Sequence, residues 1–299
     1  MISKKFLQCF ALWTATFLIL SAVSCNQTAD TPENNSSPIE NSLSENDSTD
    51  RQIEKTAEED LIVILHAGGA ENDMSYMNAQ ETFLGYYNQG YRYFEYDLKL
   101  SKDGRLIGTH NGEHLENCDF DNISYAEFTA LRLSNGYTPV NEEWLMHTIM
   151  QYPDVKIVVD AKMPDTQSDA AVLARFEELE SIYQYDLSAN IIPEVFSLEM
   201  WELLQNTTTF DKYFFSHYKV YYTVDMMLEY FEDERIWGIA LPLYTDGDIR
   251  SQLYKIQQAG KKIFVFTAYS QTDIQDVIDM GANGVYVDYP NIISNKDSP

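Results

Sequence analysis

The sequence has few cysteines and few basic residues. Its three cysteines are Cys9, Cys25 and Cys118, and because two of them fall within the first 25 residues no disulfide framework follows. Lys and Arg number 20 against 47 Asp and Glu, which gives a formal net charge of -27. We expect no nucleic-acid partner, because phosphate backbones are bound by clustered Lys and Arg.

The remaining composition is that of a globular protein. Hydrophobic residues make up 44% of the 299 positions and charged residues 22%, which excludes a wholly disordered chain. The length allows one domain of roughly 200 to 250 residues with a sizeable extension, or two small domains. We interpret most of the acidic excess as a solvated surface.

The first 25 residues predict export. Lys4 and Lys5 precede an apolar run from Phe6 to Val23, the order that is typical of a secretory signal. The ending Ser21-Ala22-Val23-Ser24-Cys25 resembles a bacterial lipobox. We therefore interpret residues 1–25 as a lipoprotein-type signal peptide, with Cys25 lipidated and the protein held on the extracytoplasmic side of a bacterial membrane. Cleavage by ordinary signal peptidase and an uncleaved membrane helix are the alternatives.

Residues 26–60 predict a disordered acidic tether. They are rich in Asn, Ser, Thr, Glu and Asp and contain no aromatic residue. Such a segment buries too little apolar surface to offset the loss of chain entropy on folding. The folded domain then spans residues 61–299.

From Leu61 onward, short apolar or β-branched runs alternate with longer helical stretches. This alternation indicates a parallel sheet wrapped by helices, and eight strands in about 230 residues favour a closed (β/α)8 TIM barrel over an open sheet. The expected strands are 61–66, 91–97, 155–161, 190–196, 219–223, 236–241, 262–267 and 284–288. The expected helices are 79–88, 142–151, 169–183, 198–205, 225–232, 248–259 and 273–280. Residues 98–140 predict a small insertion after strand two, opening with a hairpin around Lys102-Asp103-Gly104.

Functional residues of such a barrel lie at the carboxyl ends of its strands. His66 ends the first strand, and in the second strand the period of two places Glu95 and Asp97 on one face with Tyr91 and Tyr93. If that face points into the barrel, two carboxylates so close disfavour joint ionisation unless a cation lies between them, and a hard divalent metal suits them. The alternative is a reversed register with both acids outside.

Three further residues fall at neighbouring positions. His110 ends the second arm of the hairpin, so the returning chain brings it beside the end of strand two. Asp160 and Lys162 close the third strand and face one way, which predicts a third oxygen ligand for the metal and a fixed cation for an anionic group. A mutual ion pair between Asp160 and Lys162 is the alternative.

Together these residues resemble the glycerophosphodiester phosphodiesterase family. The similarity spans most of residues 61–292. It is carried by His66, by Asn78-Ala79-Gln80-Glu81-Thr82-Phe83, by Gly90 before Glu95-Tyr96-Asp97, by Ser101-Lys102-Asp103-Gly104, by His110 and by Gly281-Ala282-Asn283-Gly284-Val285-Tyr286-Val287-Asp288-Tyr289-Pro290.

The resemblance implies metal-dependent hydrolysis of a phosphodiester, a glycerophosphodiester or a related headgroup or polymer. It implies that His66 and His110 act as general acid and base, that Glu95, Asp97 and Asp160 bind Ca²⁺ or Mg²⁺, and that Lys162 faces the phosphate. The family is similar to phosphatidylinositol-specific phospholipase C in using a neighbouring substrate hydroxyl as first nucleophile, which implies a cyclic phosphate intermediate.

Ala67 stands where the family usually has Arg, so one phosphate contact of the family is missing. Either the substrate differs from ordinary glycerophosphodiesters, or the metal, Lys162 and backbone amides near Gly68 and Gly69 hold the phosphate instead. The alternative function is a non-catalytic, ligand-binding surface lipoprotein that retains the barrel. We interpret His114, His147 and His217 as structural or surface residues, and we place Tyr244 at the mouth of the site.

Overall fold

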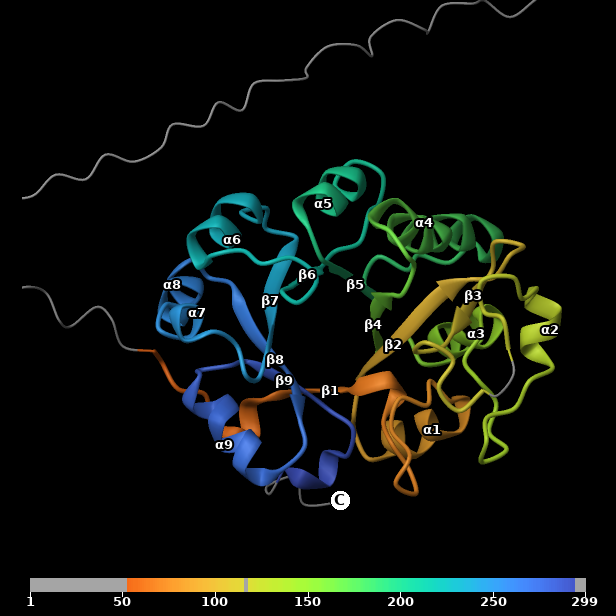
Figure 1. Ribbon diagram of the computed structural model, residues 1–299, viewed down its shortest axis with the longest axis horizontal. Coiled ribbons are helices and arrows are strands. Elements are labelled where there is room, and N and C mark those ends of the chain that lie inside the picture. Colours follow the sequence, from red (N-terminus) through yellow and green to blue (C-terminus); the bar gives the residue numbers. More distant parts are fainter. Residues whose placement is uncertain (1–52, 116–117, 294–299) are drawn as a thin grey trace, which may run out of the picture. The chain divides into compact units, whose positions relative to one another are not determined.

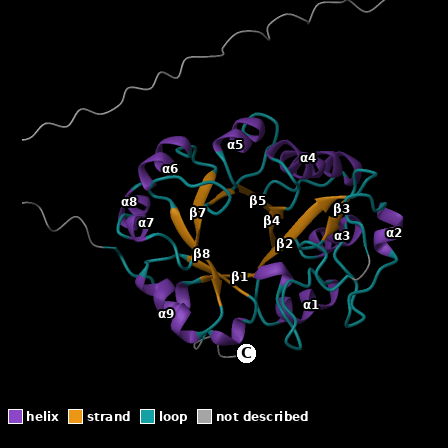
Figure 2. Ribbon diagram, in the orientation of Figure 1, coloured by secondary structure: helices purple, strands orange, loops and turns teal. Residues whose placement is uncertain are grey.

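Eight parallel strands close into a barrel in the computed structural model, which describes residues 53–115 and 118–293 (Figures 1 and 2). Each strand pairs with the next along the chain, and the first pairs with the last through Ile62 and Gly284, which closes the ring. The strands are β1 (Ile62–Leu65), β2 (Tyr93–Leu100), β4 (Lys156–Ala161), β5 (Ile191–Val195), β6 (Tyr213–Ser216), β7 (Ile236–Pro242), β8 (Lys262–Ala268) and β9 (Gly284–Val287). The predicted (β/α)8 TIM barrel is confirmed.

The helices lie outside the ring of strands (Figure 2). Most begin at a polar residue whose side chain accepts a backbone N–H of the first turn, as Asn141, Ser197 and Ser270 do, and such caps stabilise a helix start by about 1 kcal/mol. The helices are α1 (Gln80–Asn88), α2 (Tyr125–Thr129), α3 (Glu142–Gln151), α4 (Thr166–Tyr183), α5 (Leu198–Leu204), α6 (Val224–Tyr230), α7 (Gly247–Arg250), α8 (Leu253–Gln258) and α9 (Gln271–Asp279). The single helix expected over 248–259 is two, because Gln252 has ψ 7 and leaves helical geometry.

The fifth strand of the barrel was predicted at the wrong place. The sequence favoured 219–223, whereas the strand is β6, Tyr213–Ser216, whose four residues are all buried. Val220 and Tyr221 are 40% and 59% exposed and belong to the loop that follows β6. Aromatic and β-branched residues are enriched in strands, but here they line an exposed loop.

The insertion begins with the predicted hairpin. β3 (Leu106–Gly108) runs antiparallel to the end of β2, with Leu98 opposite Gly108, whereas the start of β2 pairs with β1. Glu142 ties this segment to the barrel helices, because its buried carboxylate accepts from the guanidinium groups of Arg105 and Arg175.

A layer of apolar side chains fills the inside of the barrel below the site. Ile64, Tyr93, Val158, Ile192, Phe214, Ala240 and Phe264 pack together there. Successive side chains of a strand point to opposite faces, so the residue two positions further along each strand also faces inward, one layer higher. These residues are His66, Glu95, Asp160, Glu194, Ser216, Pro242 and Phe266, and all of them line one cavity.

The chain enters the barrel at the opposite end. The backbone N–H of Glu54 donates to Gln257, and Lys55 pairs with Asp279 at 2.5 Å. Both partners lie at the ends of helices that lead into the starts of β8 and β9. Residues 53–60, which were expected to belong to the tether, thus pack on the barrel, with Ile53 partly buried against its core.

The signal peptide predicted at residues 1–25 and the part of the predicted tether up to residue 52 lie outside the described residues. Across 53–115 and 118–293, no helix has both the length and the hydropathy needed to cross a membrane.

Candidate active site

A cavity of about 350 Å³ opens at the carboxyl ends of the barrel strands. Polar and aromatic side chains both line it. The polar side chains are His66, Glu95, His110, Asp160, Lys162, Glu194, Ser216 and Thr267, and the aromatic ones are Tyr76, Tyr218, Tyr244, Phe266, Tyr269 and Tyr286. Five of the six site residues predicted from the sequence line this cavity, and Asp97 contacts Lys162 at its edge.

Glu95, Asp97 and Asp160 form a buried acidic triad. One ligand oxygen from each residue lies within 4.8 Å of the others. β2 and β4 pair with Asp97 opposite Asp160, so parallel pairing brings these two carboxylates together. The predicted inward register of Glu95 and Asp97 is the one observed, but Tyr91 precedes β2 and instead packs beside Tyr86, with ring centroids 6.1 Å apart.

Asn78 fixes the orientation of Asp97. Its side-chain N–H donates to Asp97 Oδ2 at 2.9 Å, and its side-chain oxygen accepts the Asp97 backbone N–H at 2.9 Å. Asn78 is fully buried, with φ 48. A rigid second contact of this kind is what holds a metal ligand in one orientation.

The electrostatics of the triad favour a bound cation. Burial, followed by the charges of Asp97 and Asp160, raises the pKa of Glu95 well above its ordinary value, and burial also raises the pKa of Asp160. Glu95 Oε2 accepts the Ala67 backbone N–H at 2.7 Å, while the buried Oε1 has no hydrogen-bond partner among the described residues. Three carboxylates with an unpaired oxygen fit a hard divalent ion such as Ca²⁺ or Mg²⁺, which would polarise a phosphoryl oxygen.

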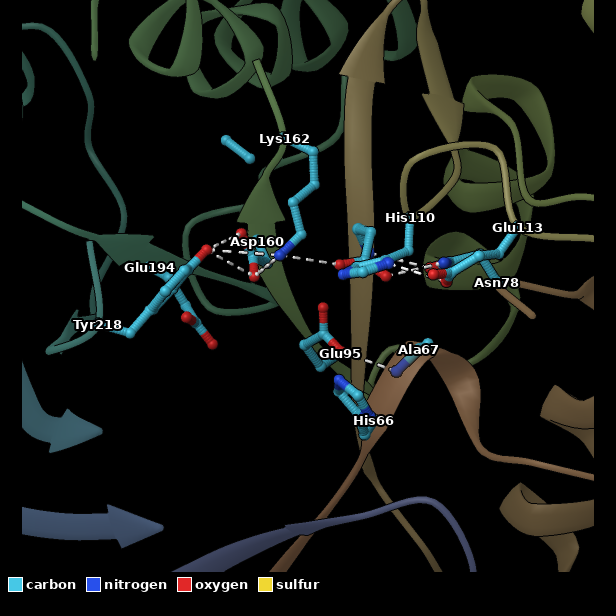
Figure 3. A network of polar contacts seen from close by, with 12 residues as sticks. His66, Ala67, Asn78, Glu95, His110, Glu113, Asp160, Lys162, Glu194 and Tyr218 are labelled. Carbon is cyan, nitrogen blue, oxygen red and sulfur yellow. Dashed lines mark hydrogen bonds and ion pairs between the residues drawn. The ribbon is translucent and has the colours of Figure 1, made fainter. Parts of the chain in front are cut away.

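Lys162 reaches from the end of β4 toward Asp160 (Figure 3). Its ammonium nitrogen is 2.5 Å from Asp160 Oδ2 and 3.2 Å from Asp97 Oδ1, so the ion pair considered from sequence is present and extends to a second acid. Burial works against the charge, but the carboxylates of Asp160 and Asp97 prevail and raise the pKa of Lys162 well above its usual value. A fixed positive charge therefore faces the cavity.

Two histidines, His66 and His110, lie at the rim of the cavity, and each is bound by a carboxylate. His66 Nδ1 lies 2.7 Å from Asp288 Oδ1, and His110 Nδ1 lies 2.8 Å from Glu113 Oε2. A carboxylate at Nδ1 fixes the tautomer and leaves Nε2 for chemistry. The ring of Tyr76 lies between them, with its centroid 4.7 Å from each imidazole.

The sequence that forms this barrel and site matches a known protein family. The Glycerophosphoryl diester phosphodiesterase family matches residues 66–292. The chain belongs to this family. Its members are phosphoric diester hydrolases, so the protein is an enzyme that hydrolyses phosphodiesters.

Solved structures show the same fold at low sequence identity. A glycerophosphodiester phosphodiesterase from Parabacteroides distasonis superimposes with TM-score 0.61 at 16% identity, covering 78% of this chain and 95% of that one. An Oleispira antarctica phosphodiesterase in complex with the product sn-glycerol-3-phosphate gives TM-score 0.63 at 18% identity, covering 78% and 95%. A glycerophosphodiester phosphodiesterase from Thermotoga maritima gives TM-score 0.58 at 19% identity, covering 76% and 94%. No curated protein sequence matches significantly.

Two of the backbone amides near Gly68 and Gly69, which were expected to hold a phosphate, are already engaged within the protein. The Ala67 N–H is used by Glu95 and the Gly69 N–H donates to His66 O at 2.8 Å, and neither glycine lines the cavity. The two glycines instead leave room for neighbouring aromatic rings. A Cβ on Gly68 would lie 2.5 Å from the ring of Tyr96, and both glycines have positive φ.

Sequence reasoning missed several polar residues of the cavity, of which Glu194 carries the clearest signal. It is the only carboxylate inside the strand expected over 190–196 and is two positions beyond Ile192, the same spacing that places Asp160 beyond Val158. Burial and then the charge of Asp160 raise the pKa of Glu194 to about 7. Ser216 could not be found, because its strand had been assigned elsewhere.

The remaining histidines are structural or at the surface, as expected. His217 Nε2 accepts the Tyr222 backbone N–H at 2.9 Å, His114 Nε2 bonds Ser75 O at 2.6 Å, and His147 is exposed on α3. Tyr244 lies at the mouth of the cavity and is 81% exposed.

Proposed function

We propose that the enzyme hydrolyses a glycerophosphodiester, or a headgroup or polymer with the same linkage, with a Ca²⁺ or Mg²⁺ ion bound by Glu95, Asp97 and Asp160. One observation carries the proposal. A buried acidic triad with an unpaired oxygen, Glu95 Oε1, shares one cavity with two histidines that are each held by a carboxylate.

We assign the proton transfers to His66 and His110. Asp288 and Glu113 hold the two Nδ1 atoms, so each Nε2 is free to take or give a proton at an oxygen on phosphorus. Lys162 supplies a positive charge to the phosphate in place of the arginine that Ala67 replaces. A neighbouring hydroxyl of the glycerol gives its proton to one histidine and attacks phosphorus, the bond to the leaving alcohol breaks, and the other histidine protonates the departing oxygen. Water then opens the cyclic phosphate to glycerol phosphate.

The structure in complex with sn-glycerol-3-phosphate supports glycerol as the retained alcohol. That product is bound by the Oleispira antarctica phosphodiesterase, which shares the fold of this chain. Release of glycerol phosphate by this enzyme is therefore the result to seek.

The test is an assay of the purified chain on a panel of glycerophosphodiesters. We expect hydrolysis to stop with excess chelator, because the triad then loses the cation that offsets its charges, and to return when Ca²⁺ or Mg²⁺ is added. Released glycerol phosphate and alcohol are measured by mass spectrometry. Absence of turnover with either metal, together with unchanged ligand binding by His66→Gln and His110→Gln, would instead establish the non-catalytic ligand-binding lipoprotein.

We also propose that the enzyme works outside the cytoplasm, attached to the membrane through a lipidated Cys25. The support is the sequence alone: an apolar run ends at Cys25 and a polar segment follows. The full-length protein expressed in a bacterium should incorporate labelled fatty acid, and Cys25→Ala should abolish labelling and block processing or release the protein from membranes. Cys118→Ala, which removes a cysteine of the folded domain, should leave labelling unchanged. A soluble wild-type protein with a free N-terminus would contradict the proposal.

A further inference from the structure

Three polar side chains form a cluster in the barrel on the side away from the histidines. Glu194 on β5, Ser216 on β6 and Tyr286 on β9 all line the cavity, and each is at most 3% exposed. In Figure 3, Asp160 and Glu95 separate Glu194 from His110. The cluster is therefore part of the same cavity but distinct from the triad.

The Glu194 carboxyl is anchored from across the barrel. Tyr286 belongs to β9, which pairs with β1 and β8 and not with β5, yet its hydroxyl donates to Glu194 Oε1 at 2.7 Å. Because this hydrogen bond joins two strands on different sides of the ring, the carboxyl is fixed in place without help from the triad. A preorganised acceptor of this kind is suited to ligand recognition.

Ser216 supplies a buried hydroxyl whose contact with Glu194 falls short of a well-formed hydrogen bond. Its hydroxyl is fully buried and makes no hydrogen bond of standard geometry with the described residues, although it lies near enough to Glu194 to lower the pKa of that carboxyl. A buried hydroxyl without a partner is destabilising. A ligand that bonds this hydroxyl would remove that cost.

We propose that Glu194, Ser216 and Tyr286 form a subsite for a hydroxyl group of the leaving alcohol, so that the substrate joins glycerol phosphate to a second polyhydric alcohol. This inference rests on the proposed function and specifies its substrate class. The retained glycerol must place its attacking hydroxyl at the triad and the histidines, which leaves the other side of the cavity to the leaving alcohol.

Hydrogen-bond complementarity selects a hydroxyl over an ammonium group. A hydroxyl donates to Glu194 and accepts from Ser216, so one ligand group satisfies both residues. The primary ammonium group of ethanolamine only donates and leaves the Ser216 hydrogen without an acceptor, and the trimethylammonium group of choline has no N–H and forms a hydrogen bond with neither residue. The choice is therefore a glycerol, polyol or sugar alcohol and not choline.

The experiment compares two diesters that differ only in the leaving alcohol. Glycerophosphoglycerol carries hydroxyls there, whereas glycerophosphopropanol carries none. We expect wild-type kcat/KM to favour glycerophosphoglycerol at least about tenfold, and we expect this preference to fall roughly fivefold in Ser216→Ala and at least tenfold in Glu194→Gln. In Ser216→Ala, kcat/KM for the propanol diester should fall by a smaller factor than kcat/KM for glycerophosphoglycerol, because the propanol diester makes no bond to the missing hydroxyl.

A second measurement separates recognition from packing. Ser216→Ala should keep or raise the Tm of the ligand-free protein, because it removes an unpaired buried hydroxyl, whereas a structural hydroxyl would lower the Tm when lost. Ser181→Ala, at an exposed position on α4, is the matched control and should change neither Tm nor preference.

Three results would overturn the inference. The wild type could show equal kcat/KM for the two diesters, or it could clearly prefer glycerophosphocholine. The third is a loss of kcat/KM in Ser216→Ala that is equal for both diesters. Calorimetry on His66→Gln compares the binding affinities of the two diesters without turnover. If His66→Gln binds glycerophosphoglycerol more tightly and the His66→Gln, Ser216→Ala double variant does not, the subsite is supported even without hydrolysis of either diester by the wild type. Such a lack of hydrolysis would count against the proposed function alone.

Discussion

Replacing His66 or His110 with Gln should lower kcat by about 100-fold or more while the barrel stays folded. Gln keeps hydrogen-bonding capacity but cannot take up or release a proton near neutral pH, and general acid or base assistance contributes typically 10²–10⁴-fold. Because Asp288 and Glu113 hold the two imidazoles separately, each variant should lose its own proton transfer. The measurement is kcat on the best glycerophosphodiester, with circular dichroism to verify folding.

His147→Gln is the control for these variants. His147 is exposed on α3, so the same substitution there should leave kcat unchanged. If His66→Gln and His110→Gln both retain full kcat, the proton-transfer roles are wrong and the two histidines serve some other purpose in the cavity.

Asp97→Asn should weaken divalent-metal binding at least tenfold, equivalent to about 1.4 kcal/mol or more. The substitution preserves shape but removes one negative charge from the triad and leaves Lys162 with a single acidic partner, Asp160. Isothermal titration with Ca²⁺ and with Mg²⁺ measures the loss directly. Hydrolysis at limiting metal should fall with it and recover in part at high metal concentration.

Asp225→Asn controls for the change of net charge. The Asp225 side chain is 73% exposed on α6, so the affinity for metal should not change. Full activity of the wild type in excess chelator, with no metal in the purified protein, would contradict the metal site altogether.

The barrel and most of its site could be predicted because they follow from local patterns. Alternation with period two within Glu95–Asp97 gave the inward register, and parallel pairing then placed Asp160 opposite Asp97. Residues at strand ends meet in a closed barrel whatever their distance in sequence, so His66, Asp160 and Lys162 could be brought together without knowing the loops.

What the sequence did not show depends on contacts between distant segments. The carboxylate that holds His66 is one case: Asp288 is 222 residues from His66, and no periodicity links them. Ser216 was missed for a different reason. Its strand is only four residues long, whereas the exposed stretch 219–223 has the stronger strand composition, so burial overrode propensity.

The place where the chain joins the barrel determines how a tethered enzyme would present its cavity. Glu54 and Lys55 are fixed at the end where the strands begin, and the cavity opens at the other end. The proposed anchor at Cys25 would therefore reach the barrel at its base, the end opposite the mouth of the cavity. Attachment at that end would keep the entrance for the substrate clear of the point where the chain joins the barrel.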